Sequence, residues 1–207
     1  VLDTRIEGRE EEDRDEEIYN EPDRQLLGVV QEDFVERTVR ESKARWIVLA
    51  QQIMVMPFLD NGSPYNVDAW DGYPAARDRL YDAIESRKGE VIVLTGDIHS
   101  SWAANLARDV DLEKGGEGKN LAVEFVTPGI TSPGFPFTDN EGAESLASVF
   151  REENPHIKYM NLWQRGFMMM SINKDRIQAG WYHAQTVEEE TEPENNIKFG
   201  QGVKVPY

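Results

Sequence analysis

The sequence predicts an α/β fold built from two mixed sheets in layers. Two continuous apolar runs, residues 46–56 and 91–95, are typical of strands buried on both faces. A helical pattern at residues 74–88 separates them, which is the order of a strand–helix–strand unit. Further along, residues 166–172 and 176–184 flank a short polar turn and predict an antiparallel hairpin. We expect the strand–helix–strand unit in one sheet and the hairpin in the other.

Composition limits the classes of protein to which the chain can belong. Its 207 residues are 39% hydrophobic, which suffices for one sizeable domain with a packed core. The net charge of −17 argues against nucleic acid or an anionic membrane as a main partner. Because the chain has no cysteine, it can form neither a disulfide nor a thiolate metal site within itself. No apolar run is long enough to span a membrane.

Both ends of the chain carry acidic segments. Residues 7–24 predict a solvated, partly mobile loop, because their acids lack the spacing of a calcium-binding loop. Residues 188–207 predict an acidic surface connection followed by a C-terminal tail. The chain begins at Val1 and shows no signal-peptide pattern. We therefore expect it to be a piece of a longer protein, with residues 1–187 as the structured part.

The first half of the chain places polar residues at one edge of a sheet. Residues 31–45 predict a charged helix that turns three apolar side chains to the core, namely Phe34, Val35 and Val39. The strand at 46–56 stops at Pro57, and the helix at 74–88 buries a second apolar face, namely Ala76, Leu80, Ala83 and Ile84. Since the strands at 46–56 and 91–95 should be parallel neighbours, their carboxyl ends share one edge. We expect Asp68 and Asp71 at that edge, beside the turn after residue 95.

The second half of the chain is more irregular. Residues 121–127 predict a strand, followed by a loop rich in proline and glycine and a short helix that ends near Asn154. The three methionines at 168–170 predict core filling on a buried strand. His183, beside Trp181 on the hairpin, is expected to be structural.

Residues 96–101, GDIHSS, are the strongest candidate for chemistry. Asp97 and His99 could bind one cation together, since a carboxylate and an imidazole two residues apart can face the same ion. Equally, Asp97 could accept amide hydrogen bonds in the turn and His99 could bond to a neighbour. Ser100 could cap a helix over residues 101–110, whose start would favour an anion. A nucleophilic role for Ser100 is disfavoured, because the GxSxG motif is absent.

Ordered blocks of sequence resemble the PhoD-type alkaline phosphatases of the calcineurin-like metallophosphoesterase superfamily. The resemblance runs from about Leu2 to Val187 and rests on six segments in the expected order: QEDFVERTVRESKARWIVLAQQIMV, DAWDGYPAARDRL, VIVLTGDIHSSWAANL, VEFVTPGITSPG, NPHIKY and RGF. It implies a layered αββα metallophosphoesterase sandwich, of which residues 1–187 would be the C-terminal half.

The resemblance also implies an activity and a set of site residues. Enzymes of this kind hydrolyse phosphate esters with a metal-activated hydroxide, using Fe³⁺ and Ca²⁺. Asp97 and His99 match expected metal ligands and catalytic residues, and Arg5, Asn154 and His156 match substrate-binding positions. For Arg5, an ion pair with Asp3 is as plausible as phosphate binding. For Asn154 and His156, a structural role is an equal alternative, with Asn154 at a helix end and His156 hydrogen-bonded at the surface. In the segment 68–73, Trp70 and Tyr73 are expected to pack in the core.

One departure from the family limits what this chain can do. The N-terminal half of the family supplies most of the metal ligands, and this sequence lacks those motifs. The resemblance thus implies a chain that is inactive alone and needs the missing half, either in the same protein or as a nicked partner. A non-catalytic phosphate-binding module of the same fold is the alternative. By resemblance the protein is extracellular or periplasmic.

Overall fold

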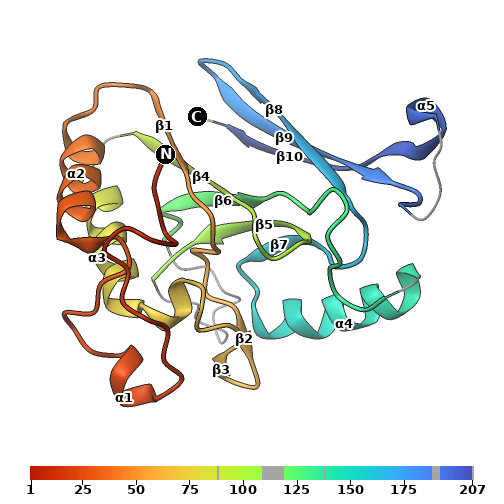
Figure 1. The fold of residues 1–207 in the computed structure, drawn as a ribbon. Helices are drawn as coiled ribbons and strands as arrows, with labels where there is room; N and C mark the ends of the chain where they lie inside the picture. Colours follow the sequence, from red (N-terminus) through yellow and green to blue (C-terminus); the bar gives the residue numbers. More distant parts are fainter. Residues whose placement is uncertain (88, 109–118, 138, 188–191, 207) are drawn as a thin grey trace.

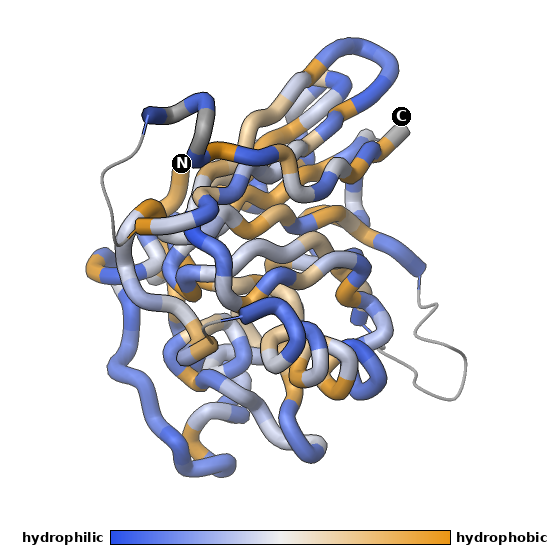
Figure 2. The backbone as a smooth tube through the Cα atoms, turned by 90° about the vertical axis from the view of Figure 1, so that its right-hand side faces the viewer, coloured by the Kyte–Doolittle hydropathy of each residue, from blue (hydrophilic) through white to orange (hydrophobic). Residues whose placement is uncertain are grey.

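The chain folds into three layers: helices, a large sheet and a small sheet (Figure 1). This computed structural model describes residues 1–87, 89–108, 119–137, 139–187 and 192–206. The helices cover one face of the large sheet, and the small sheet packs on its other face. In Figure 2 the central strands carry most of the hydrophobic segments, whereas the peripheral loops are mainly hydrophilic. No helix among the described residues is long and apolar enough to cross a membrane.

The large sheet has five strands in the order β1-β4-β6-β5-β7. Their bounds are β1 (Trp46–Ala50), β4 (Glu90–Thr95), β6 (Ala122–Val126), β5 (Ser101–Leu106) and β7 (Ile157–Asn161). Strands β1, β4 and β6 run parallel, and β5 is antiparallel to both of its neighbours. The predicted strand–helix–strand unit is therefore confirmed: β1 and β4 are parallel neighbours, joined through helix α3.

Three helices of three or more turns lie among the described residues. They are α2 (Gly28–Glu41), α3 (Pro74–Glu85) and α4 (Asn140–Glu153), and the single-turn elements are α1 (Glu16–Tyr19), η1 (Trp70–Gly72) and α5 (Pro193–Asn196). Helix α3 buries its predicted apolar face and carries Pro74 in its first turn. In α2, Val35 and Val39 are buried as predicted, but Phe34 is 52% exposed, so its assignment to the core was wrong.

The small sheet contains the predicted hairpin and one further strand. Strand β9 (Arg176–Ala184) pairs antiparallel with β8 (Gly166–Ile172) on one side and with β10 (Ile197–Pro206) on the other. Its Trp181 packs between the sheets, with its ring centroid 5.9 Å from that of Phe125 and 4.8 Å from that of Tyr159. Residues 197–206 therefore belong to the sheet and do not form the expected tail; residues 188–191 lie outside the described part of the chain.

Alternation along β8 corrects the prediction for its methionines. Met168 and Met170 pack against the core between the sheets, whereas Met169 is 58% exposed on the outer face. Successive strand residues point to opposite faces, so three consecutive methionines cannot all fill one core. On the same outer face Phe167 and Phe199 are also exposed. Among the described residues, the second helix layer of an αββα sandwich is not formed over this face.

Three other expectations differ from the structure. Residues 101–106, expected in a helix, form β5, because this strand lies between β6 and β7 and buries both faces; residues 109–110 lie outside the described part. The first strand ends at Ala50, and the apolar residues after it form a buried loop with a ribbon of β2 (Leu59–Asp60) and β3 (Ser63–Pro64). The helix before Asn154 is longer than predicted and is followed by β7.

Candidate functional site

A strained turn follows strand β4 at the carboxyl edge of the large sheet. The amide of Ile98 donates to the carbonyl of Gly96 at 2.8 Å, which closes a γ-turn around Asp97. Asp97 has φ 67° and His99 has φ 58°, both in the left-handed region that few residues other than glycine adopt. Such strain persists only where the surrounding structure holds it, and it is concentrated at functional sites. The turn that the sequence singled out is thus unusual in its backbone as well.

The ring of His99 is oriented by a neighbouring loop. Its Nδ1 lies 2.7 Å from the carbonyl oxygen of Pro133, and a carbonyl can only accept, so Nδ1 carries the proton. The Nε2 atom then keeps its lone pair, as in a histidine that binds a metal ion. A Cβ on Gly134 would lie 2.7 Å from the His99 carbonyl oxygen, so only glycine fits this approach. Asp97 is exposed beside this half-buried histidine.

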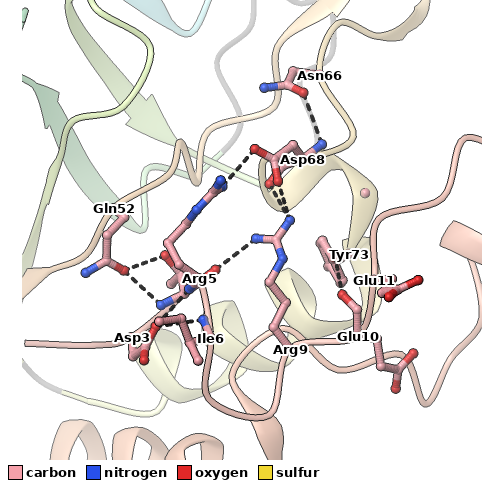
Figure 3. Close-up of polar contacts among 12 residues, drawn as sticks. Asp3, Arg5, Ile6, Arg9, Glu10, Glu11, Gln52, Asn66, Asp68 and Tyr73 are labelled. Atoms are coloured by element: carbon pink, nitrogen blue, oxygen red, sulfur yellow. Dashed lines mark hydrogen bonds and ion pairs between the residues drawn. The ribbon is translucent and has the colours of Figure 1, made fainter.

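Arg5 lies at the same edge and is held by Asp68 (Figure 3). Its Nη1 donates to the Asp68 carboxylate at 2.7 Å, and the other oxygen of Asp68 accepts from Arg9 at 2.5 Å. The hydrogen bond that Arg5 donates to Asp68 raises the pKa of Arg5, and the negative charge of Asp97 adds to this effect. Asp3 instead accepts the backbone amides of Arg5 and Ile6, so the expected side-chain pair between Asp3 and Arg5 is replaced by a pair with Asp68.

The acidic segment 7–24 is tied to the domain through Tyr73. The guanidinium of Arg9 lies 5.0 Å from the Tyr73 ring centroid, and that of Arg24 lies 4.6 Å from it. Tyr73 donates its hydroxyl to the carbonyl of Glu10 at 2.7 Å, and buried Arg24 donates to the carbonyl of Gly72 at 3.0 Å. The segment is therefore anchored along its inner side, and Tyr73 packs in the core as expected.

Side chains supply the hydrogen bonds of the buried loop after β1. A buried backbone amide needs an acceptor, and in the described chain the ladder with β4 ends at Ala50. Glu124 accepts from the amides of Val55 and Met56, and Asp71 accepts from that of Phe58 at 2.9 Å. Asp71 is also paired with Arg77. The sequence motifs did not point to Glu124, although a glutamate inside the apolar run at 121–127 is a visible signal.

Asn154 and His156 serve the same loop. Asn154 Oδ1 accepts from the Leu59 amide at 2.9 Å, and its Nδ2 donates to the carbonyls of Leu59 and Phe150. His156 Nε2 donates to the Pro57 carbonyl at 2.7 Å, and burial lowers the pKa of His156 to about 4. Both residues are almost fully buried. This placement favours the structural alternative over a role at the rim of the site.

Neither serine of the turn is available as a nucleophile. Ser100 is buried, with its Oγ 2.6 Å from the indole nitrogen of Trp102. Ser101 lies 3.1 Å from Nε2 of His183, and both are buried between the sheets. Gly200 packs so closely on the His183 ring that a Cβ there would clash with it. His183 therefore links the two sheets, in keeping with its expected structural role.

The turn fits part of a metal site. Asp97 offers carboxylate oxygens and His99 a free imidazole nitrogen, a donor set that suits divalent and trivalent cations. Within the described residues, no group of three or more His, Cys, Asp or Glu side chains could hold a metal ion. Two ligands from this chain would therefore need further donors to complete a coordination sphere.

Comparisons with known proteins agree with this arrangement. The family model described as PhoD-like phosphatase matches residues 1–181. Alkaline phosphatase D of Bacillus subtilis (strain 168) is 40% identical over 166 residues, which cover 77% of this chain and 27% of that protein. A solved structure titled "Structure of PhoD" superposes with a TM-score of 0.83 at 31% identity, covering 99% of this chain and 39% of that one.

The chain thus spans between about a quarter and two fifths of the proteins that it matches. The shared fold confirms the α/β architecture with a mixed large sheet that the sequence predicted. The match extends over most of the chain, and its identity is high enough to establish common descent. The chain belongs to the PhoD-like phosphatase family.

Proposed function

We propose that the complete protein hydrolyses phosphate esters with bound metal ions, and that this chain supplies Asp97 and His99 as two of the ligands. The observation that carries the proposal is the γ-turn after β4, where two residues with positive φ present a carboxylate and an oriented imidazole at one sheet edge. Family membership supplies the reaction class, since the curated relative is named alkaline phosphatase D. Resemblance to the family favours Fe³⁺ and Ca²⁺ as the ions.

Asp97, His99 and Arg5 have separate roles in the proposed reaction. When bound, the ions would neutralise phosphoryl charge and lower the pKa of a bound water. His99 donates from Nδ1 to the Pro133 carbonyl and so keeps its Nε2 lone pair, and Asp97 contributes a carboxylate. Arg5, held by Asp68 near Asp97, can donate to a phosphate oxygen. Asn154 and His156 are left out of the substrate site because their polar groups serve the buried loop.

The remaining ligands are proposed to come from the rest of the protein. Asp97 and His99 are two residues apart in one turn, no larger group of possible ligands is found among the described residues, and the relatives are longer than this chain. The chain alone is then expected to be inactive, whether the rest precedes it in one polypeptide or associates as a nicked partner. From its resemblance to the family, we also propose that the protein is extracellular or periplasmic. A non-catalytic phosphate-binding module is the alternative, favoured by the small number of ligands among the described residues.

Substitution of the two ligands in the full-length protein tests the proposal. Asp97→Asn and His99→Gln should each lower kcat/KM for p-nitrophenyl phosphate by about 100-fold or more, since a metal ion contributes several kcal/mol to the transition state. The Asp97→Asn protein should also retain less metal, measured by elemental analysis. Unchanged turnover would remove these residues from the site. Absence of turnover in the wild-type protein supplied with metals would favour the phosphate-binding module.

A further inference from the structure

Glu124 is a buried carboxylate that the proposed reaction does not use. It lies in the middle of β6 with 0% of its surface exposed. Its oxygens accept from the amide of Val55 at 2.9 Å, the amide of Met56 at 2.7 Å and the hydroxyl of Thr95 at 2.5 Å. Among the described residues, no lysine or arginine donates a hydrogen bond to it. A buried carboxylate held by neutral donors alone is costly to keep ionised.

The donors to Glu124 belong to the two segments that carry the candidate site. Thr95 ends β4 and directly precedes the turn with Asp97, and its hydroxyl also accepts from Gln51 Nε2 at 2.5 Å. Val55 and Met56 belong to the loop after β1. The neighbouring Gln52 accepts from the amide of Thr4, the residue before Arg5, and its carbonyl accepts from the amide of Gly96. Glu124 is thus hydrogen-bonded both to Thr95, just before the Asp97 turn, and to the loop after β1 that holds the segment of Arg5.

The surroundings of Glu124 destabilise its ionised form. Burial raises the pKa of Glu124 to about 7, and the negative charge of Asp71 adds to the effect. Asp71 is in turn paired with Arg77. Burial also raises the pKa of Tyr81, and the charges of Glu124 and Asp71 add to that rise. Because the pKa in the folded state exceeds that of the unfolded chain, the folded protein loses stability as the pH rises from about 4.5 to 7.

We propose that Glu124 is a positioning residue: through Thr95 and the amides of Val55 and Met56, its carboxylate holds the Asp97 turn and the loop beside Arg5 in the geometry that binds metal and phosphate. This role deepens the proposed function and rests on Asp97 and His99 as metal ligands. The γ-turn at Asp97 is strained and persists only where the surrounding structure holds it, and Thr95, just before Gly96 of the turn, is held through both its main chain and its side chain. The Thr95 carbonyl accepts from the amide of Thr127 at 2.9 Å, and its hydroxyl is fixed by Glu124.

Three variants of the full-length protein test the role. Glu124→Gln keeps the shape but removes the carboxylate, Thr95→Val removes only the hydroxyl that links Glu124 to the turn, and Thr95→Ser restores that hydroxyl. We expect Glu124→Gln and Thr95→Val to weaken Ca²⁺ binding about tenfold in calorimetric titration at pH 9, as for other residues that orient metal ligands. Thr95→Ser should keep the wild-type affinity. The kcat for p-nitrophenyl phosphate should fall in the same two variants and recover in the third.

Thermal unfolding separates positioning from packing. Because Gln does not ionise, the melting temperature of Glu124→Gln relative to wild type should rise between pH 6 and pH 9, while its Ca²⁺ affinity stays low. Unchanged Ca²⁺ affinity in Glu124→Gln and Thr95→Val would overturn the role. So would a melting temperature of Glu124→Gln that falls further below wild type as the pH rises.

Failure of the proposed function gives a different pattern. If the wild-type protein neither binds Ca²⁺ nor hydrolyses p-nitrophenyl phosphate, the assignment of Asp97 and His99 falls. Crystal structures of the wild type and of Thr95→Val then decide the role of Glu124. A displaced Asp97 turn in the variant supports positioning, and an unmoved turn overturns it.

Discussion

Single residues in this chain act mainly through the backbone groups that they satisfy. Asp97 and His99 adopt positive φ in a turn closed by one amide hydrogen bond, which places both proposed ligands at one edge of the sheet. By contrast, the Oδ1 and Nδ2 atoms of the Asn154 side chain both form hydrogen bonds inside the fold. The sequence motif NPH alone could not distinguish a polar group that faces substrate from one that satisfies a loop.

Asn154 therefore gives a prediction at the scale of the residue. Asn154→Ala should lower the free energy of unfolding by about 2 kcal/mol, because the buried Leu59 amide loses its acceptor. The KM for p-nitrophenyl phosphate should stay near that of the wild type. Urea denaturation and steady-state kinetics of the full-length protein measure the two quantities. Asn154→Asp keeps an acceptor for the Leu59 amide but places an oxygen against the carbonyls of Leu59 and Phe150, so it should also lose stability. A raised KM at unchanged stability would restore Asn154 to the substrate site.

At the scale of elements, loops position the site and strands support it. The loop 127–137 orients His99 through Pro133 and is itself tied to the small sheet, where the Gly166 amide donates to the Gly129 carbonyl at 3.0 Å. Arg165, just before β8, donates to the carbonyl of Ser132. The small sheet therefore contributes to the site indirectly, by fixing a loop that contacts a candidate ligand.

Gly134 gives a prediction at this scale. Gly134→Ala should place a Cβ against the His99 carbonyl and push the turn from its loop, since that oxygen lies 2.7 Å away and belongs to the backbone. We expect a loss of about 1–3 kcal/mol in stability together with a lower kcat, measured by denaturation and kinetics on the full-length protein. Gly142→Ala in α4 is the control, because there alanine favours the helix and the nearest atom belongs to the Phe137 side chain. Wild-type kcat in Gly134→Ala would show that the loop does not set the orientation of His99.

At the scale of the whole molecule, the described chain forms three layers and offers two candidate ligands. The outer face of the small sheet exposes Phe167, Met169 and Phe199, and no group of three or more possible metal ligands lies among the described residues. Both observations agree with a chain that matches 39% of a solved relative's length. The catalytic unit is thus proposed to be larger than these residues.

Metal stoichiometry tests this view of the whole molecule. Purified residues 1–207 should retain less than one metal ion per chain after dialysis, because two ligands bind a cation weakly. The longer protein should retain a cluster of ions and hydrolyse p-nitrophenyl phosphate. Elemental analysis and turnover of both forms provide the measurement, with circular dichroism as the control for folding of the shorter form. Tight metal binding and turnover by folded residues 1–207 would contradict the proposal that further ligands are needed.

The local sequence pattern was enough to predict structural features that depend on residues close together in the chain. The parallel pair β1 and β4, the buried face of α3, the hairpin of β8 and β9 and the turn at Asp97 all follow from hydrophobic period, chain direction and turn chemistry. The ordered motifs were enough to predict the family that the comparisons confirm.

Tertiary contacts decided the rest, because they join residues far apart in the chain. The segment 101–106 has helix-forming alanines but becomes β5, since burial between two strands outweighs a weak local preference. Glu124 can lie in an apolar strand only because Thr95 and two amides of a loop 68 and 69 residues away reach it. The internal hydrogen bonds of Asn154 and His156 likewise depend on a loop 95 to 99 residues away, which the motif alone does not reveal. The sequence shows which hydrogen bonds a polar side chain can form, but only the folded chain shows which partner it bonds.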